Sequence, residues 1–193
     1  MKAFDQDGIN KFQTHIFERI IGEGFNQPLK ENRYRSDYVE RLIVEILGDE
    51  LELTSGDWAA WDITHNSGLK IDVKQSAARQ SWSGGGTIPD KSNVGRFDIA
   101  ERSYVWDKKG WRDQLGRVAG LYIFAWHPIY DPDIADHRDP RQWTFYVLPS
   151  QALPAGQKSI GLRPLQQLAE PVTYAELQAA ANDAAKQNID TQI

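Results

Sequence analysis

The order in which apolar patterns change along the chain constrains its fold most. Helical spacing over residues 37–48 is followed by two strand-like stretches, and a later pair of strands precedes a last helical stretch. The first two strands lie at 57–65 and 68–77, the later pair at 120–127 and 143–149, and the last helix at 173–187. This order predicts an α/β protein in which helices flank a central mixed β-sheet.

Boundary residues support these elements. Ser36 and Gly48 are expected to cap the helix at 37–48, and Thr173 is expected to be the N-cap of the last helix. The turn residues at 66–68 predict a hairpin between the first two strands. Apolar residues with helical spacing over 12–21 predict a further helix that packs on the domain.

Length and composition bound the domain organisation. The chain has 193 residues, 40% of them hydrophobic, which predicts a single domain over 1–193. Glycines at 83–86 and Pro89 predict a mobile insertion over 80–117, and residues 187–193 form a polar tail. The chain has neither a long apolar run nor the features of a signal peptide, so we expect a cytoplasmic protein with no membrane partner. Because cysteine is absent, a bound metal would need oxygen or imidazole ligands.

One acid in the helix at 37–48 is predicted to point inward. On a helical wheel Glu40 falls inside the apolar arc that includes Val39 and Ile43. It does not stand at the N3 position of a capping box with Ser36, and no base lies three or four residues away. A buried carboxylate without a local partner is costly unless a metal or a positive charge meets it. A place at the rim of the arc, within reach of solvent, is the alternative.

Two more acids fall on the predicted hairpin. Strand alternation puts Asp72 and Lys74 on one face, with Ile71 and Val73 on the other. Asp62, on the preceding strand, is expected to lie across the hairpin from the region of Asp72. Two carboxylates on neighbouring strands repel unless a cation lies between them. The ordinary alternatives are that Asp62 ends its strand and that Asp72 lies on a solvated face.

This combination resembles the signature of the PD-(D/E)XK nuclease superfamily, which has the restriction-endonuclease-like fold. The helix acid, the strand acid and the Asp-x-Lys of that signature correspond here to Glu40, Asp62 and the run Asp72-Val73-Lys74. Gln75 follows, where the family often has a glutamine or a small polar residue. Trp61 replaces the usual proline before the strand acid, and aspartate is the less common second acid. The similarity in element order extends from about residue 36 to the last helix.

The resemblance implies a magnesium-dependent endonuclease that hydrolyses DNA phosphodiester bonds in a restriction, repair or recombination role. Mn²⁺ is expected to substitute for Mg²⁺. Oxygen ligands suit this hard cation, which neutralises charge on the phosphate and provides a hydroxide near neutral pH. The implied metal ligands are Glu40, Asp62, Asp72 and the Val73 carbonyl, and the implied catalytic residues are Glu40, Asp62, Asp72, Lys74 and Gln75.

Positive charge gathers in the middle of an otherwise acidic chain. The net charge is -5, yet residues 70–117 carry ten basic and six acidic side chains. Three tryptophans, Trp82, Trp106 and Trp111, lie among these basic side chains. Such a mixture is suited to binding nucleic acid, because cations attract phosphates and aromatic rings stack on exposed nucleobases. The residues expected to contact DNA are Lys70, Arg79, Lys91, Arg96, Arg102, Lys108, Lys109, Arg112 and Arg117. A mixed-charge surface with tryptophans in the core is the alternative.

Two other classes of function stay open at this level. A catalytically inactive protein on the same fold would bind nucleic acid or another partner. A purely structural domain would require Glu40 and Asp62 to face solvent. If both strands of a duplex are cleaved, a symmetric homodimer is favoured.

Overall fold

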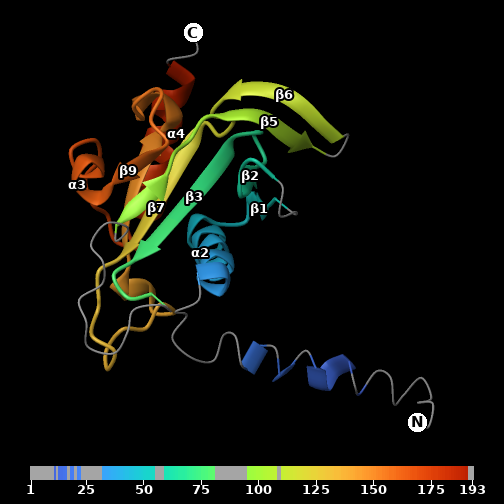
Figure 1. Ribbon diagram of the computed structural model, residues 1–193, viewed down its shortest axis with the longest axis vertical. Helices are drawn as coiled ribbons and strands as arrows, with labels where there is room; N and C mark the ends of the chain where they lie inside the picture. The colour runs from blue at the N-terminus through green and yellow to red at the C-terminus, as the bar shows by residue number, and fades with distance from the viewer. Residues whose placement is uncertain are drawn as a thin grey trace.

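The computed structural model describes residues 32–54, 59–80, 95–107 and 110–190, together with parts of the segment 11–22. Its centre is a five-stranded sheet in the order β1-β2-β3-β7-β8 (Figure 1). The strands β1, β2 and β3 pair antiparallel, β3 and β7 pair parallel, and β8 is antiparallel to β7. Their bounds are Leu51–Leu53, Ile63–His65, Lys70–Ala77, Leu121–His127 and Thr144–Pro149. The predicted α/β class with a mixed central sheet flanked by helices is therefore confirmed.

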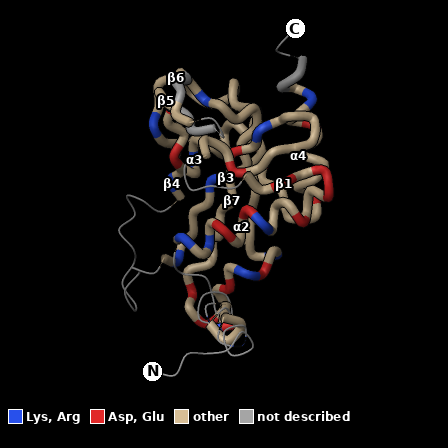
Figure 2. The backbone as a smooth tube through the Cα atoms, turned by 90° about the vertical axis from the view of Figure 1, so that its right-hand side faces the viewer, with Lys and Arg blue, Asp and Glu red and all other residues tan. Residues whose placement is uncertain are grey.

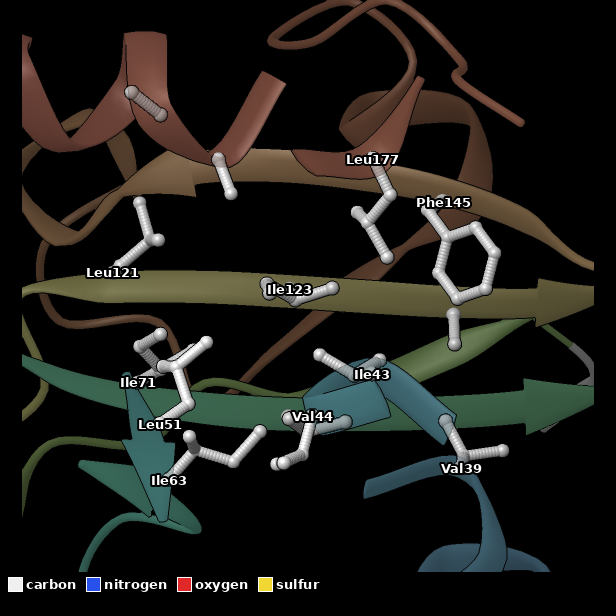
Figure 3. Packing of buried hydrophobic residues seen from close by; sticks show 14 of the residues in the cluster. Val39, Ile43, Val44, Leu51, Ile63, Ile71, Leu121, Ile123, Phe145 and Leu177 are labelled. Atoms are coloured by element: carbon white, nitrogen blue, oxygen red, sulfur yellow. The ribbon is translucent and has the colours of Figure 1, made fainter. Parts of the chain in front are cut away.

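Strand alternation divides the apolar residues between the two faces of this sheet. On one face, helices α2 (Asn32–Leu47) and α4 (Leu177–Asp190) cover a core that includes Ile43, Ile71 and Ile123 (Figure 3). On the other face, a second core includes Tyr122, Phe124 and residues of the small elements β4 (Arg96–Asp98), β9 (Ser159–Gly161) and α3 (Leu162–Leu165). The even-numbered residues of β3, including Asp72, belong to this second face.

Several predicted boundaries are shifted. Helix α2 begins at Asn32, so Ser36 lies inside the helix and is not its N-cap. Gly48 does end it, with a φ of 106° and its N–H donating to the Val44 carbonyl at 2.9 Å. Helix α4 begins at Leu177, one turn after Thr173, and continues to residue 190, through the start of the predicted polar tail.

The segment 11–22 is helical where it is described, as its spacing predicted. Ile16 and Ile21 are 41% and 39% exposed, so these two apolar side chains are not buried. Phe12, Phe17 and Ile20, the other residues of the predicted packing face, lie outside the described residues. No helix within the described part of the chain is long and apolar enough to cross a membrane.

The segment 80–117, predicted to be a mobile insertion, contains three strands within its described residues. Residues 95–107 and 110–117 contain β4, β5 (Arg102–Asp107) and β6 (Gly110–Gly116), while 81–94 lie outside the described residues. Strand β4 pairs with β9, and β5 pairs with β6 in a separate two-stranded sheet. The β5–β6 hairpin projects from the body of the molecule (Figure 1).

Candidate active site

The second face of β3 brings Asp72 and Lys74 together. Asp72 is 6% exposed, so it is not on a solvated strand face. Its Oδ1 forms an ion pair with the Lys74 ammonium, whose side chain is only 20% exposed. Residues two apart on a strand share a face, which places the ammonium beside the carboxylate. The strand therefore presents a buried acid and a half-buried base as a pair.

Asp62 lies where the β2–β3 hairpin starts to open. Ile63 pairs with Ile71, and the Asp62 N–H donates to the Ile71 carbonyl at 3.0 Å, so Asp62 comes opposite Asp72 as predicted. Asp62 Oδ2 accepts the Val73 N–H at 2.7 Å. The carboxyls of Asp62 and Asp72 also share a hydrogen bond. The two acids are thus in direct contact across the hairpin.

Glu40 is half-buried on α2 and has a local partner that was not predicted. The Ser36 hydroxyl, one turn earlier, donates to Glu40 Oε1 at 3.0 Å. A hydroxyl four residues earlier is neither a base nor part of a capping box, so neither of the two sequence patterns includes it. The carboxylate of Glu40 still interacts electrostatically with Lys74, Asp72 and Asp62. Glu40 therefore borders the Asp62–Asp72–Lys74 group without joining it.

Burial disfavours the ionised form of all three acids. It raises the pKa of Asp72 to about 7; the Lys74 ammonium opposes this rise, and the Asp62 charge adds to it. The pKa of Asp62 is raised by burial, with Lys74 opposing and Glu40 adding. Burial also raises the pKa of Glu40, against its hydrogen bond from Ser36. A cation bound here would relieve this cost, because it favours the charged carboxylates.

Tyr122, which the sequence analysis did not single out, completes the group. It lies directly beside Asp72 in the parallel β3–β7 pair, and its hydroxyl hydrogen-bonds to the Asp72 carboxyl. Burial, followed by the Asp72 charge, raises the pKa of Tyr122. The only signal in the sequence was one hydroxyl in an apolar strand, and that signal does not identify its partner.

Gln75 takes part in a buried network that joins α2 to β3. The fully buried Arg35 donates to Gln75 Oε1 at 2.6 Å and to Gln80 Oε1 at 2.6 Å. Gln75 Nε2 donates to Asn32 Oδ1 at 2.7 Å. Both ends of the Gln75 amide are thus engaged with α2, the helix that carries Glu40. Sequence reasoning missed Arg35, since a buried arginine in a polar helical turn looks like a surface residue.

Most of the predicted DNA-contacting residues with described side chains interact with the protein itself. Arg117 donates to the backbone carbonyls of Ile99, Leu153 and Pro154, and its side chain is 9% exposed, so its charge is used within the fold. Lys70 Nζ lies 3.9 Å from the centre of the Trp61 ring. Arg79 donates to the Tyr130 carbonyl, Arg96 to Ser159 Oγ, and Arg102 pairs with Asp98 at 3.6 Å.

Of these, Arg96 and Arg102 are exposed, and Arg102 lies at the base of the β5–β6 hairpin. Lys91, Lys108 and Lys109 lie outside the described residues, as does the side chain of Arg112.

The donor set can be tested against a metal. Among the described residues, no three His, Cys, Asp or Glu side chains are grouped closely enough to hold a metal ion together. Mg²⁺ usually keeps several waters and takes only one or two protein carboxylates. The contacting pair Asp62 and Asp72 fits that requirement, and Glu40 interacts electrostatically with both. Val73, predicted to offer its carbonyl, contributes its N–H to Asp62 in this structure.

Comparison with known proteins adds little. No protein-family model matches the chain, and no curated protein matches it. Among solved structures, a bacterial homing endonuclease is similar with a TM-score of 0.33 and 18% sequence identity. The match covers 69% of this chain and 76% of the endonuclease chain. At this TM-score the similarity carries no argument about fold family or activity.

Proposed function

We propose that this protein is a metal-dependent nuclease of the PD-(D/E)XK type that hydrolyses DNA phosphodiester bonds in a restriction, repair or recombination role. One observation carries the proposal: across the β2–β3 hairpin, Asp72 forms an ion pair with Lys74 and a hydrogen bond with Asp62. Glu40 borders them from α2. Their order along the chain matches the signature described above, with Asp62 one residue before β2 and not within it.

Asp62 and Asp72 would hold Mg²⁺ or Mn²⁺, and Glu40 would bind it through water. The bound cation would neutralise charge on the phosphate and acidify a water molecule. Lys74 would donate from its ammonium to the attacking water or to a phosphate oxygen, which stabilises the charge that develops in the transition state. Tyr122 would keep the Asp72 carboxyl oriented through its hydrogen bond. The Arg35–Gln75 contact would keep α2, and so Glu40, fixed against β3.

The test is a cleavage assay with supercoiled, linear duplex and single-stranded DNA, in Mg²⁺, in Mn²⁺ and in chelator. Asp72→Asn should abolish, and Lys74→Ala should strongly reduce, the cleavage that the wild type shows with either metal. Glu52→Gln is the matched control, because Glu52 is an exposed carboxylate on β1 of the same sheet. Cleavage that persists in chelator, or in Asp72→Asn, would contradict the proposed site.

An inactive nucleic-acid-binding protein on the same fold is the second candidate. The observation that favours it is the ion pair between Lys74 and Asp72, which engages both the proposed catalytic lysine and a proposed metal ligand. This function predicts DNA binding that is unaffected by metal and by Asp72→Asn, with no cleavage under any condition. Light scattering with and without duplex DNA would report whether a homodimer forms.

A further inference from the structure

The β5–β6 hairpin exposes large apolar side chains on one of its faces. Tyr104 is 61% exposed, Trp111 60% and Leu115 84%. In the ladder Tyr104 pairs with Asp113, and strand alternation places Trp111 on the same face of β6 as Asp113. Tyr104 therefore shares this face with Trp111, whereas Leu115 lies where the register of the pair shifts. We call Tyr104 and Trp111 the hairpin apolar face.

A surface of this kind is unusual on a protein that works alone. Large side chains exposed together on one element mark a site of interaction. The hairpin forms its own two-stranded sheet, separate from the central sheet that supports the two cores, and it projects outward (Figure 1). The hairpin apolar face is thus presented to a partner outside the domain.

Charge indicates the class of that partner. Residues 102–116 contain four basic and two acidic side chains, in a chain whose net charge is -5. In Figure 2 the hairpin tube carries basic segments, whereas acidic segments gather near β1. Cations attract phosphates, and exposed aromatic rings stack on bases. Since the bases of a duplex are already stacked on one another, an aromatic face of this kind favours unpaired bases.

The base of the hairpin adjoins the candidate active site. Strand β6 ends at Gly116, and residues 117–120 lead directly into β7, where Tyr122 contacts Asp72. Arg117 fastens this junction by donating to the Pro154 carbonyl at 2.7 Å and to the Ile99 carbonyl at 3.0 Å. The positive charges of Arg117 and Arg102 both act on the Tyr122 hydroxyl. A nucleic acid held on the hairpin would therefore reach the candidate active site at the end of the hairpin where β6 leads into β7.

We propose that the hairpin apolar face binds unpaired DNA bases by stacking, so that the substrate has a single-stranded or locally opened segment beside the bond that is cleaved. The position of the cleaved bond rests on the proposed function. The binding of unpaired bases rests on the hairpin alone, and it is tested without cleavage.

The test measures, in chelator, the affinity of the full chain for a fluorescent oligothymidine and for a duplex of the same length. Trp111→Ala should weaken oligothymidine binding by about 5- to 150-fold, the range expected for the loss of one stacked base. Trp111→Phe keeps an aromatic ring and should restore most of the affinity. The matched control is Tyr174→Ala, because Tyr174 is an exposed aromatic residue, 38% exposed, outside the hairpin.

Unchanged oligothymidine affinity in both Trp111→Ala and Tyr104→Ala would overturn the inference. Equal losses for oligothymidine and duplex would overturn its preference for unpaired bases. A wild-type dimer that Trp111→Ala converts to a monomer, without loss of oligothymidine binding, would assign the face to a second copy of the chain and overturn it as well. A wild-type protein that binds oligothymidine but cleaves no DNA with either metal would refute the proposed nuclease and leave the hairpin inference standing.

Discussion

The parallel pair β3–β7 buries polar side chains near both of its ends, and the two ends differ in kind. At the start of the pair, Asp72 lies beside Tyr122 and contacts Lys74 and Asp62. At the other end, His127 lies beside Ala77 and packs against His137, with ring centres 4.3 Å apart. We call these the carboxylate end and the histidine end.

Burial acts on both ends, but the outcomes are opposite. It raises the pKa of the acids, whereas it lowers the pKa of His127 and, aided by the charges of His127 and Arg35, lowers that of His137 to about 3. At neutral pH the two imidazoles are uncharged and pack against Trp143 as aromatic rings. The acids stay crowded together with an ammonium. The histidine end is therefore suited to packing, and the carboxylate end to binding a cation.

The rate of DNA cleavage should distinguish the carboxylate end from the histidine end more strongly than any other measurement. If the carboxylate end is the active site, Lys74→Ala should lower the rate of DNA cleavage by about 100- to 1000-fold, the usual cost of removing one charge-stabilising donor. His137→Phe, which keeps an aromatic ring among His127 and Trp143, should stay within about threefold of the wild type, on the expectation that it touches no reacting group. Initial rates on supercoiled DNA with Mg²⁺ measure both. If both variants lost a similar share of their cleavage rate, the carboxylate end could not be assigned as the active site.

The pH dependence of stability should reveal the histidine end. Because the folded pKa of His137 lies below that of the unfolded chain, unfolding takes up a proton between about pH 3 and pH 6.5. Its contribution to stability is complete above about pH 6.5 and is lost as the pH falls toward 3, by on the order of a few kcal/mol. Urea unfolding at about pH 7.5 and about pH 5 should show a smaller loss in His137→Phe than in the wild type. Equal losses would mean that His137 is not held neutral.

Metal should reveal the carboxylate end. The folded pKa of Asp72 lies above its unfolded value, so the folded protein keeps an extra proton between about pH 4 and pH 7 and loses stability as the pH rises through that window. In chelator at about pH 8, Asp72→Asn should therefore melt about 2–4 °C above the wild type, equivalent to about 1 kcal/mol.

Magnesium should reverse that order. The wild type should gain about 2.7 kcal/mol of stability at a hundredfold excess of Mg²⁺ over its Kd, and Asp72→Asn should gain less. Thermal melts over a magnesium series measure both responses. Identical gains in the two proteins would show that Asp72 is not a metal ligand.

Gln75 lies on β3 between the two ends, and one variant should show whether its role is structural or catalytic. Its amide bonds to Arg35 and Asn32, so Gln75→Ala should destabilise the protein by about 1.5–3 kcal/mol, the usual value of a hydrogen bond to a charged group. Cleavage at a temperature where the variant is folded should fall much less than in Lys74→Ala. A loss of activity as large as that of Lys74→Ala, without loss of stability, would place Gln75 in the active site.

The carboxylate end could be anticipated because its signals are local. Alternation in "KIDVK" separates Asp72 and Lys74 from Ile71 and Val73, and the turn at 66–68 brings Asp62 opposite. Such patterns need only the period of a strand and the geometry of a short hairpin. The α/β class followed from the same periodicities.

Partners that come from distant parts of the chain could not be anticipated. Tyr122 reaches Asp72 only through the parallel pairing of β3 with β7, and nothing local specifies that register. Arg35 is buried because the amide oxygens of Gln75 and Gln80 satisfy its guanidinium, and those residues lie 40 and 45 positions away. The β5–β6 hairpin was missed because glycines near 83–86 were taken to indicate mobility up to residue 117.

The hydrogen bond from the Val73 N–H to Asp62 Oδ2 gives the protein a built-in reporter. Backbone pairing between β2 and β3 ends near Ile71, and the side chain of Asp62 supplies the next acceptor along the strand. This carboxylate is therefore held in place by the sheet before any ligand arrives, which lowers the ordering cost of binding. A cation that binds Asp62 must change the electron density at this acceptor oxygen. The chemical shift and the hydrogen-exchange rate of the Val73 backbone amide would therefore report whether the site is occupied.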